Sequence, residues 1–256
     1  MTSDFGLRDG YVGAMRGVVL QRCPEACLVD ISHEIPAQDV AHAATVLRDT
    51  VPYFPKGSVH LAVVDPGVGT PRRAIVARAA GHLFVGPDNG LLLAALGSLG
   101  GEAEVWEIGS RFVPRSCSAT FHGRDIFAPM AGRLAAGMAP QEVGRCVGSL
   151  VPSPLTQART IASGILGRVS VVDHFGNLKT DVHASMLAAD AAVKISFPGR
   201  DLTAIEGLSK TYGDAKVGAV MVLTGSSGYI EIAVNQGAAS EVLALAPGDA
   251  VKIDVI

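Results

Sequence analysis

One stretch decides the fold of this chain: Val59-His60-Leu61-Ala62-Val63-Val64-Asp65-Pro66-Gly67-Val68-Gly69-Thr70-Pro71-Arg72-Arg73. Its first half is a short apolar run rich in β-branched residues, which predicts a buried strand. Its second half is a loop with proline and glycine that begins with a carboxylate and ends with two cations. In open α/β sheets, ligands bind at the carboxyl ends of the strands, where Asp65 is expected. The stretch alone fits equally well an ordinary turn in which Asp65 caps backbone N–H groups.

Length and composition are typical of a globular protein. The 256 residues, 48% of them hydrophobic, suffice for one large domain or two smaller ones. A formal net charge of -3 predicts no general attraction to nucleic acid or to an anionic membrane. Because no apolar stretch reaches transmembrane length and no signal-peptide pattern opens the chain, we expect a soluble, cytoplasmic protein with small-molecule partners. The four cysteines lack zinc-site spacing and are expected to be reduced.

Helical and strand patterns alternate in the first part of the chain. The short pattern at residues 1–6 indicates the end of a strand followed by Asp4. Further strands are predicted at 27–32, 59–64, 74–78, 83–85 and 104–106, and helices at 10–21, 38–50, 89–99 and 126–137. This order predicts an α/β domain with a mostly parallel sheet and helices packed on it.

The second part of the chain has a different pattern. Residues 149–160, with Pro152 and Pro154, have the composition of a linker. We therefore expect an N-terminal α/β domain over residues 1–155 and a smaller C-terminal domain over residues 156–256. Short β-rich runs at 167–172, 192–197, 219–224, 229–234 and 250–256 are separated by glycine-containing turns, with one helix near 238–245. This pattern predicts a compact antiparallel sheet or β-barrel.

Three loops carry side chains suited to chemistry. Asp65 and Arg72 share the first loop, His122 lies in the second, and Asp4 lies in the third. An aspartate, an arginine and a histidine could together hold one water molecule. Each residue also has a structural interpretation, and a lone histidine at a helix N-terminus is more often structural than catalytic.

A metal site is the other chemistry that these loops could support. Oxygen and nitrogen donors are present at Asp4, His60, Asp65, Asp88 and His122. No His-x-x-x-His pair or Asp-x-Asp cluster accompanies them, so we expect a metal-independent protein.

Six motifs, which run in order through nearly the whole chain, resemble those of one enzyme family. This family comprises the S-adenosyl-L-methionine (SAM) hydrolases that form adenosine, also called SAM hydroxide adenosyltransferases, and it is related to the fluorinating and chlorinating adenosyl enzymes. The motifs are Ser3-Asp4-Phe5-Gly6, residues 63–73, Gly86-Pro87-Asp88-Asn89-Gly90, Thr120-Phe121-His122-Gly123-Arg124-Asp125, Asp173-His174-Phe175-Gly176-Asn177 and Gly225-Ser226-Ser227-Gly228-Tyr229.

The resemblance implies a fold, an assembly and a catalytic set. It implies an N-terminal α/β domain, a C-terminal β-barrel domain, and a homotrimer whose active sites lie between one subunit's first domain and a neighbour's second. The family's catalytic residues fall on Asp65, Arg72 and His122, and its ribose-binding acid falls on Asp4. The halogenating relatives have an aromatic residue at the Asp65 position and replace the other two, so the side chains here favour water over halide as the nucleophile.

The resemblance also implies SAM as the substrate, with no cofactor, and a wider binding set. Phe175 is expected to stack on adenine and Asn177 to offer a donor and an acceptor. Because Gly123 lets the backbone approach the reacting centre closely, we infer from its position that its N–H helps to hold the water. The other expected substrate contacts are Asn89, Phe121, Asp173, Ser226, Tyr229 and Asn235. Two positions depart from the halogenating relatives: Gln38 replaces a tryptophan against the substrate, and Ser227 replaces an arginine near the methionine end.

Three other functions remain open at this point. A halide-using adenosyl transferase would form no adenosine without halide. A non-catalytic sensor of SAM or adenosine would bind tightly without turnover. A metal-dependent nucleoside hydrolase would lose activity on chelation.

Overall fold

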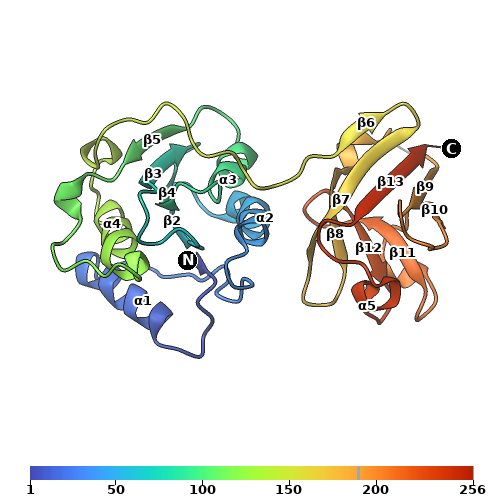
Figure 1. Ribbon diagram of the computed structural model, residues 1–256, viewed down its shortest axis with the longest axis horizontal. Coiled ribbons are helices and arrows are strands. Elements are labelled where there is room, and N and C mark those ends of the chain that lie inside the picture. Colours follow the sequence, from blue (N-terminus) through green and yellow to red (C-terminus); the bar gives the residue numbers. More distant parts are fainter. Residues whose placement is uncertain (189–190, 256) are drawn as a thin grey trace. The chain divides into compact units, whose positions relative to one another are not determined.

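The computed structural model describes residues 1–188 and 191–255 of the chain (Figure 1). The chain divides into two compact units, Met1–Pro154 and Leu155–Ile256. Each unit buries its own cluster of apolar side chains.

The first unit is built on a five-stranded sheet in the order β1-β2-β4-β3-β5. The strands are β1 (Thr2–Ser3), β2 (Val59–Val63), β3 (Ala74–Ala79), β4 (His82–Pro87) and β5 (Glu104–Glu107). Strands β1, β2 and β4 pair in parallel, whereas β3 pairs antiparallel with both β4 and β5. The α/β class is therefore confirmed, but the sheet is mixed rather than mostly parallel. Only Ala80 and Gly81, both with positive φ, connect β3 to β4, and so short a turn forces an antiparallel hairpin.

Helices cover this sheet. They are α1 (Tyr11–Arg22), α2 (Val40–Thr50), α3 (Leu93–Ser98) and α4 (Ala128–Ala135), with short 3-10 turns η1 (Val51–Tyr53), η2 (Ser110–Phe112) and η4 (Pro140–Glu142) and a π-helical turn η3 (Gly123–Phe127). Met15 of α1 and Met130 of α4 share one buried cluster with Leu61 and Val63 of β2. Helices α1 and α4 pack on each other, as do α2 and α3 (Figure 1).

Three expected elements of the first unit differ from the structure. Residues 27–32 form no strand, because β1 has only two residues and offers a single bridge, from Thr2 to Ser32. The helix expected at 89–99 begins only at Leu93, since Gly90 has a φ of +89° and turns the chain. The helix expected at 126–137 starts as the π-helical turn η3 and continues as α4.

The second unit is an antiparallel, nearly closed barrel. Its strand order is β10-β9-β13-β7-β8-β12-β11, with β6 paired to β7. Ser209, just after β10, donates its N–H to the Val222 carbonyl of β11 at 2.7 Å, so the two ends of the sheet meet. The elements are β6 (Arg159–Ile161), β7 (Gly164–Val172), β8 (Leu178–His183), β9 (Val193–Ser196), β10 (Ile205–Glu206), β11 (Val220–Thr224), β12 (Tyr229–Val234), β13 (Ala250–Val255), α5 (Ala239–Leu243), η5 (Ala184–Met186) and η6 (Tyr212–Asp214).

The expected barrel is thus confirmed, although three of its strands were not predicted. Strands β6 and β10 are only three and two residues long. Strand β8 buries Thr180 and Asp181, so its sequence lacks a clean apolar alternation. The last expected strand forms as β13, and its final residue, Ile256, lies outside the described residues.

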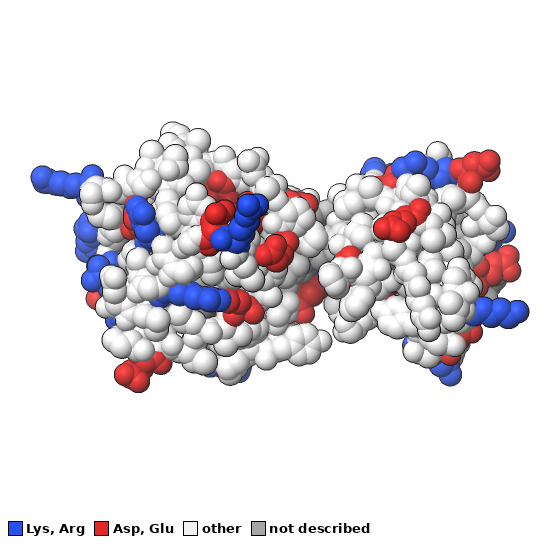
Figure 2. All heavy atoms as spheres, turned by 90° about the horizontal axis from the view of Figure 1, so that it is seen from below, with Lys and Arg blue, Asp and Glu red and all other residues white. Residues whose placement is uncertain are grey.

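Charge and hydropathy agree with the composition. On the face shown in Figure 2, basic and acidic side chains are intermixed rather than gathered by sign. Within residues 1–188 and 191–255, no helix is both long and apolar enough to cross a membrane.

Candidate active site

Three adjacent parallel strands of the first unit end in polar side chains. Asp4 follows β1, Asp65 follows β2, and Asn89 follows β4. The Asn89 amide donates to the Val64 carbonyl at 2.8 Å and its oxygen accepts from the Leu91 N–H at 3.2 Å. Asn89 therefore fixes the end of β2 directly before Asp65. The carboxyl edge of the sheet carries the residues that the sequence placed there.

Asp65 and Arg72 form a buried, multidentate ion pair. The Arg72 Nε lies 3.0 Å from both carboxylate oxygens, and its Nη2 lies 2.5 Å from Oδ2. The two side chains are only 5% and 11% exposed, so solvent screens the pair little. Gly69 explains how the loop closes: it has a φ of +78°, and a Cβ there would lie 2.6 Å from the Ala119 carbonyl oxygen. Only glycine allows both the conformation and the approach.

The same guanidinium also binds His122. Arg72 Nη2 lies 2.7 Å from His122 Nδ1. Because arginine has only N–H donors, Nδ1 is the acceptor and the imidazole proton resides on Nε2. Burial first, and then the positive charge of Arg72, lower the pKa of His122, so the ring is neutral at neutral pH. The structure thus brings Asp65, Arg72 and His122 into one contiguous cluster.

An aromatic cluster lies beside His122. The rings of Phe5, Tyr11 and Phe121 contact one another at centroid distances of 5.3 to 5.9 Å. A Cβ at Gly123 would lie 3.1 Å from the sulfur of Met15 and 3.3 Å from the rings of Phe121 and Phe5. Gly123 therefore packs closely against this cluster, a feature that its position in the sequence did not disclose.

Asp4 is held from one side. Its Oδ2 accepts the backbone N–H of Gln38 at 2.8 Å, and Gln38 has a φ of +66°. In the part of the chain that the structure describes, Oδ1 makes no hydrogen bond. The carboxylate thus has a fixed orientation and an acceptor oxygen available for a ligand.

The residues considered as metal donors do not gather. His60 is buried against Phe84 and His82, with its Nε2 3.2 Å from His82 Nδ1. The Asp88 carboxylate binds Arg73 and the N–H of Val151. In residues 1–188 and 191–255, no three His, Cys, Asp or Glu side chains form a group that could hold a metal ion.

In the second unit, Asp173 organises the turn before β8. Its Oδ1 accepts the N–H groups of Phe175 and Asn177 at 2.8 and 2.9 Å, and its Oδ2 accepts the Asn177 amide at 3.0 Å. Gly176 completes the turn with a φ of +82°. As a result the Phe175 ring is 73% exposed while Asn177 is buried. Asp173 therefore shapes the turn that presents Phe175.

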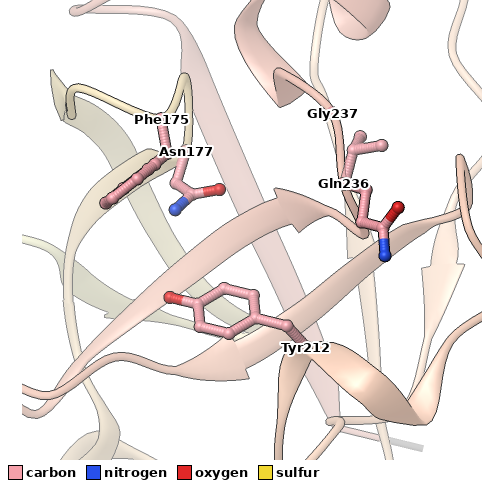
Figure 3. Close-up of a pocket in the computed structure, with 6 residues that line it drawn as sticks. Phe175, Asn177, Tyr212, Gln236 and Gly237 are labelled. Atoms are coloured by element: carbon pink, nitrogen blue, oxygen red, sulfur yellow. The ribbon is translucent and has the colours of Figure 1, made fainter.

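Phe175 and Asn177 line a pocket of about 510 Å³ in this unit (Figure 3). The remaining lining residues come from η6 and from the end of β12, and they are Tyr212, Val234, Gln236 and Gly237. None of these four residues was predicted from the sequence. Tyr212 lies outside the six motifs, in a turn that Thr211 and Asp214 cap, and the φ of +56° at Gln236 has no signature in the sequence.

Besides Asp173, three expected binding residues of this unit lie outside the pocket lining. The Tyr229 ring packs edge-on against His183 at 5.1 Å. Ser226 is exposed in the turn between β11 and β12. The Asn235 amide donates to the Ala215 carbonyl at 2.7 Å, which ties the end of β12 to the segment after η6.

Comparisons with known proteins identify the relatives of this chain. Residues 1–144 match the family model described as the SAM hydroxide adenosyltransferase N-terminal domain, and residues 167–252 match that of its C-terminal domain. A protein of Salinispora arenicola named (R)-S-adenosyl-L-methionine hydrolase is 45% identical over 98% of this chain and 95% of its own. A Thermus thermophilus protein of the same name is 40% identical, covering 98% of this chain and 97% of its own.

More distant and structural relatives complete the comparison. A fluorinase of Nocardia brasiliensis is 27% identical over 99% of this chain and 95% of its own. The crystal structure of an uncharacterized conserved protein from Thermotoga maritima superposes with a TM-score of 0.90 at 36% identity, covering 98% of both chains. The matches span both units in order, and the chain belongs to the SAM hydroxide adenosyltransferase family.

Proposed function

We propose that this protein hydrolyses SAM to adenosine and L-methionine through attack of water on C5′ of the ribose. The Asp65–Arg72–His122 cluster is the observation that carries the proposal. The names of its relatives support it, since proteins 40–45% identical over nearly the whole chain are called SAM hydrolases.

The chemistry places its main demand on the nucleophile. The sulfonium of SAM leaves as a neutral thioether, so the leaving group needs no general acid. Water has a pKa of about 15.7 and supplies almost no hydroxide at neutral pH. In the reaction an O–C5′ bond forms as the C5′–S bond breaks, and the water releases one proton.

The cluster meets this demand with one acceptor and one donor. The Asp65 carboxylate accepts a hydrogen bond from the water and takes up its proton, which then passes to solvent. The Nε2–H of His122, fixed in that tautomer by Arg72, donates to the water oxygen. The guanidinium places positive charge beside the nucleophile and favours its deprotonation.

We assign substrate contacts from the remaining geometry. The available oxygen of Asp4 binds the ribose diol, since a carboxylate is a natural acceptor for two hydroxyls. The pocket that Phe175 and Asn177 line takes the adenine, with the exposed Phe175 ring stacking on it. Ser226 and Asn235 fall on the adenine- and methionine-binding stretches that the family resemblance implies. We further propose that the protein is a homotrimer whose active sites lie between one subunit's first domain and a neighbour's second. We also propose a cytoplasmic location.

The test is incubation of purified protein with SAM in halide-free buffer, followed by chromatography of adenosine and methionine. We expect equal amounts of both products. A halide requirement would identify a transferase. SAM left unconsumed after prolonged incubation would refute the proposed hydrolysis.

A further inference from the structure

Among the described residues that line the pocket, Tyr212 is the one whose side chain bonds to a buried carboxylate. Its hydroxyl donates to Oε1 of Glu231 at 2.6 Å. Tyr212 comes from the short turn η6, whereas Glu231 lies on β12 and is 5% exposed. The hydrogen bond thus joins a loop-borne aromatic ring to the rigid wall of the barrel.

Glu231 is a buried acid on a strand of the barrel. A carboxylate in a buried strand is costly unless it is hydrogen-bonded, so an acid on β12 needs a structural or functional reason. A Cβ at Gly225 would lie 2.9 Å from Oε2 of Glu231, so the glycine leaves room for the second oxygen. The hydroxyl of Tyr212 supplies a hydrogen bond to this buried carboxylate.

The turn around Tyr212 is capped by the side chains of Thr211 and Asp214, which bond to its backbone. Asp214 Oδ2 accepts the N–H groups of Lys210 and Thr211 at 2.8 and 3.0 Å. These bonds fix the path of the chain but leave the ring free to rotate about its side-chain torsions. The hydroxyl bond to Glu231 is what selects one ring position against the pocket.

We propose that Glu231 is a positioning residue that holds the Tyr212 ring in the pocket wall and thereby sets the affinity for the aromatic base of the substrate. This inference rests on the proposed function, because it assumes that the pocket takes the base. Glu231 contacts the substrate only through Tyr212. Neither residue is among those assigned to the chemical step, so we expect their substitution to change the binding of the base and not kcat.

Four variants test the inference: Tyr212→Phe, Glu231→Leu, Glu231→Gln and the double variant Tyr212→Phe/Glu231→Leu. We expect Glu231→Leu and Tyr212→Phe each to raise KM for SAM and Kd for adenosine by about tenfold, the loss expected for a hydrogen bond to a charged group. The kcat should stay within about twofold. Glu231→Gln should remain close to wild type, because a glutamine oxygen accepts the same bond.

The double variant separates positioning from a general structural role. If Glu231 acts through the Tyr212 hydroxyl, the double variant binds adenosine no more weakly than Glu231→Leu alone. Losses that add fully would overturn the inference, as would an unchanged Kd in Tyr212→Phe. Burial and the Glu231 bond raise the pKa of Tyr212, so its ultraviolet titration should shift to lower pH in Glu231→Leu.

Thr180→Val is the matched control for barrel stability. Thr180 is buried in β8 and donates to the Ile230 carbonyl at 2.8 Å, but it does not line the pocket. The Thr180→Val substitution should lower the melting temperature without changing Kd for adenosine. If the variants change Kd for adenosine as expected but the wild-type protein does not turn over SAM, only the proposed function is refuted. If the protein turns over SAM but substitutions at residues 212 and 231 leave Kd for adenosine unchanged, only this inference is refuted.

Discussion

Arg72 Nη2 lies 2.7 Å from Nδ1 of His122, on the same guanidinium that binds Asp65. This contact determines the tautomer of the imidazole, because the arginine can only donate. The contact joins two side chains fifty positions apart in the chain, with Arg72 donating and His122 accepting. Arg72 also lies over the Phe127 ring at 5.1 Å, which fixes the guanidinium from the side of the core.

Replacement of Arg72 by alanine should remove both contacts at once. We expect kcat/KM to fall by about 10²- to 10³-fold, as for the loss of one preorganised electrostatic group. Steady-state assays of adenosine release measure the effect. Arg78→Ala is the control, since Arg78 forms an exposed ion pair with Glu104 away from the cluster, and it should leave kcat/KM unchanged. Equal losses in both variants would contradict the role given to Arg72.

Because of His122, activity should persist to a pH below the ordinary histidine pKa. Its pKa is lowered by burial and by Arg72, so the neutral ring persists below the ordinary histidine pKa of about 6.5. The acid limb of the kcat/KM profile should therefore lie below that value. His122→Asn retains an acceptor for Arg72 but lacks the Nε2–H, and we expect it to lose about 10²-fold in kcat. An acid limb above the ordinary histidine pKa would contradict the lowered pKa of His122.

Gly69 should be irreplaceable for a geometric reason. Gly69→Ala places a Cβ 2.6 Å from the Ala119 carbonyl oxygen at a φ of +78°, so we expect a loss of about 1–3 kcal/mol in stability and reduced kcat. Gly57→Ala is a matched control: Gly57 has a φ of +89° but no atom within 4 Å of the added Cβ. Urea unfolding and adenosine release should show that Gly57→Ala costs stability alone. Full activity in Gly69→Ala would show that the loop tolerates rearrangement.

Stability should fall in mild acid because of buried neutral histidines. Burial lowers the pKa of His60 and of His33 to about 4. Between the unfolded value of about 6.5 and that folded value, the unfolded chain binds more protons, so the free energy of unfolding decreases as pH falls through this window. His60→Leu should make the slope shallower, as measured by urea unfolding at several pH values. A slope unchanged in His60→Leu would assign the acid sensitivity elsewhere.

Much of the fold and site could be predicted from local patterns. The apolar run of β2 and the proline-glycine loop after it placed Asp65 at a strand end, where the structure has it. The antiparallel β3–β4 hairpin was harder, because its turn is Ala80-Gly81 and Ala80 takes an unusual positive φ. Strand β8 was missed because Asp181 is buried and its Oδ1 accepts the N–H of Arg168 at 2.7 Å, a pairing that no periodicity reveals.

The second unit shows the same limit at the pocket. Phe175 and Asn177 were predicted from a motif, and both line the pocket. Tyr212 was missed because its importance arises from a contact with Glu231, nineteen positions away in the chain. Side chains that act through long-range contacts carry no local signature.

The incorporation of ¹⁸O from labelled water tests the central claim most directly. The wild-type protein is incubated with SAM in H₂¹⁸O, and adenosine and methionine are analysed by mass spectrometry. Attack of water on C5′ predicts one ¹⁸O atom in the 5′-hydroxyl of adenosine and none in methionine. Label in methionine, or adenosine formed without label, would contradict the account.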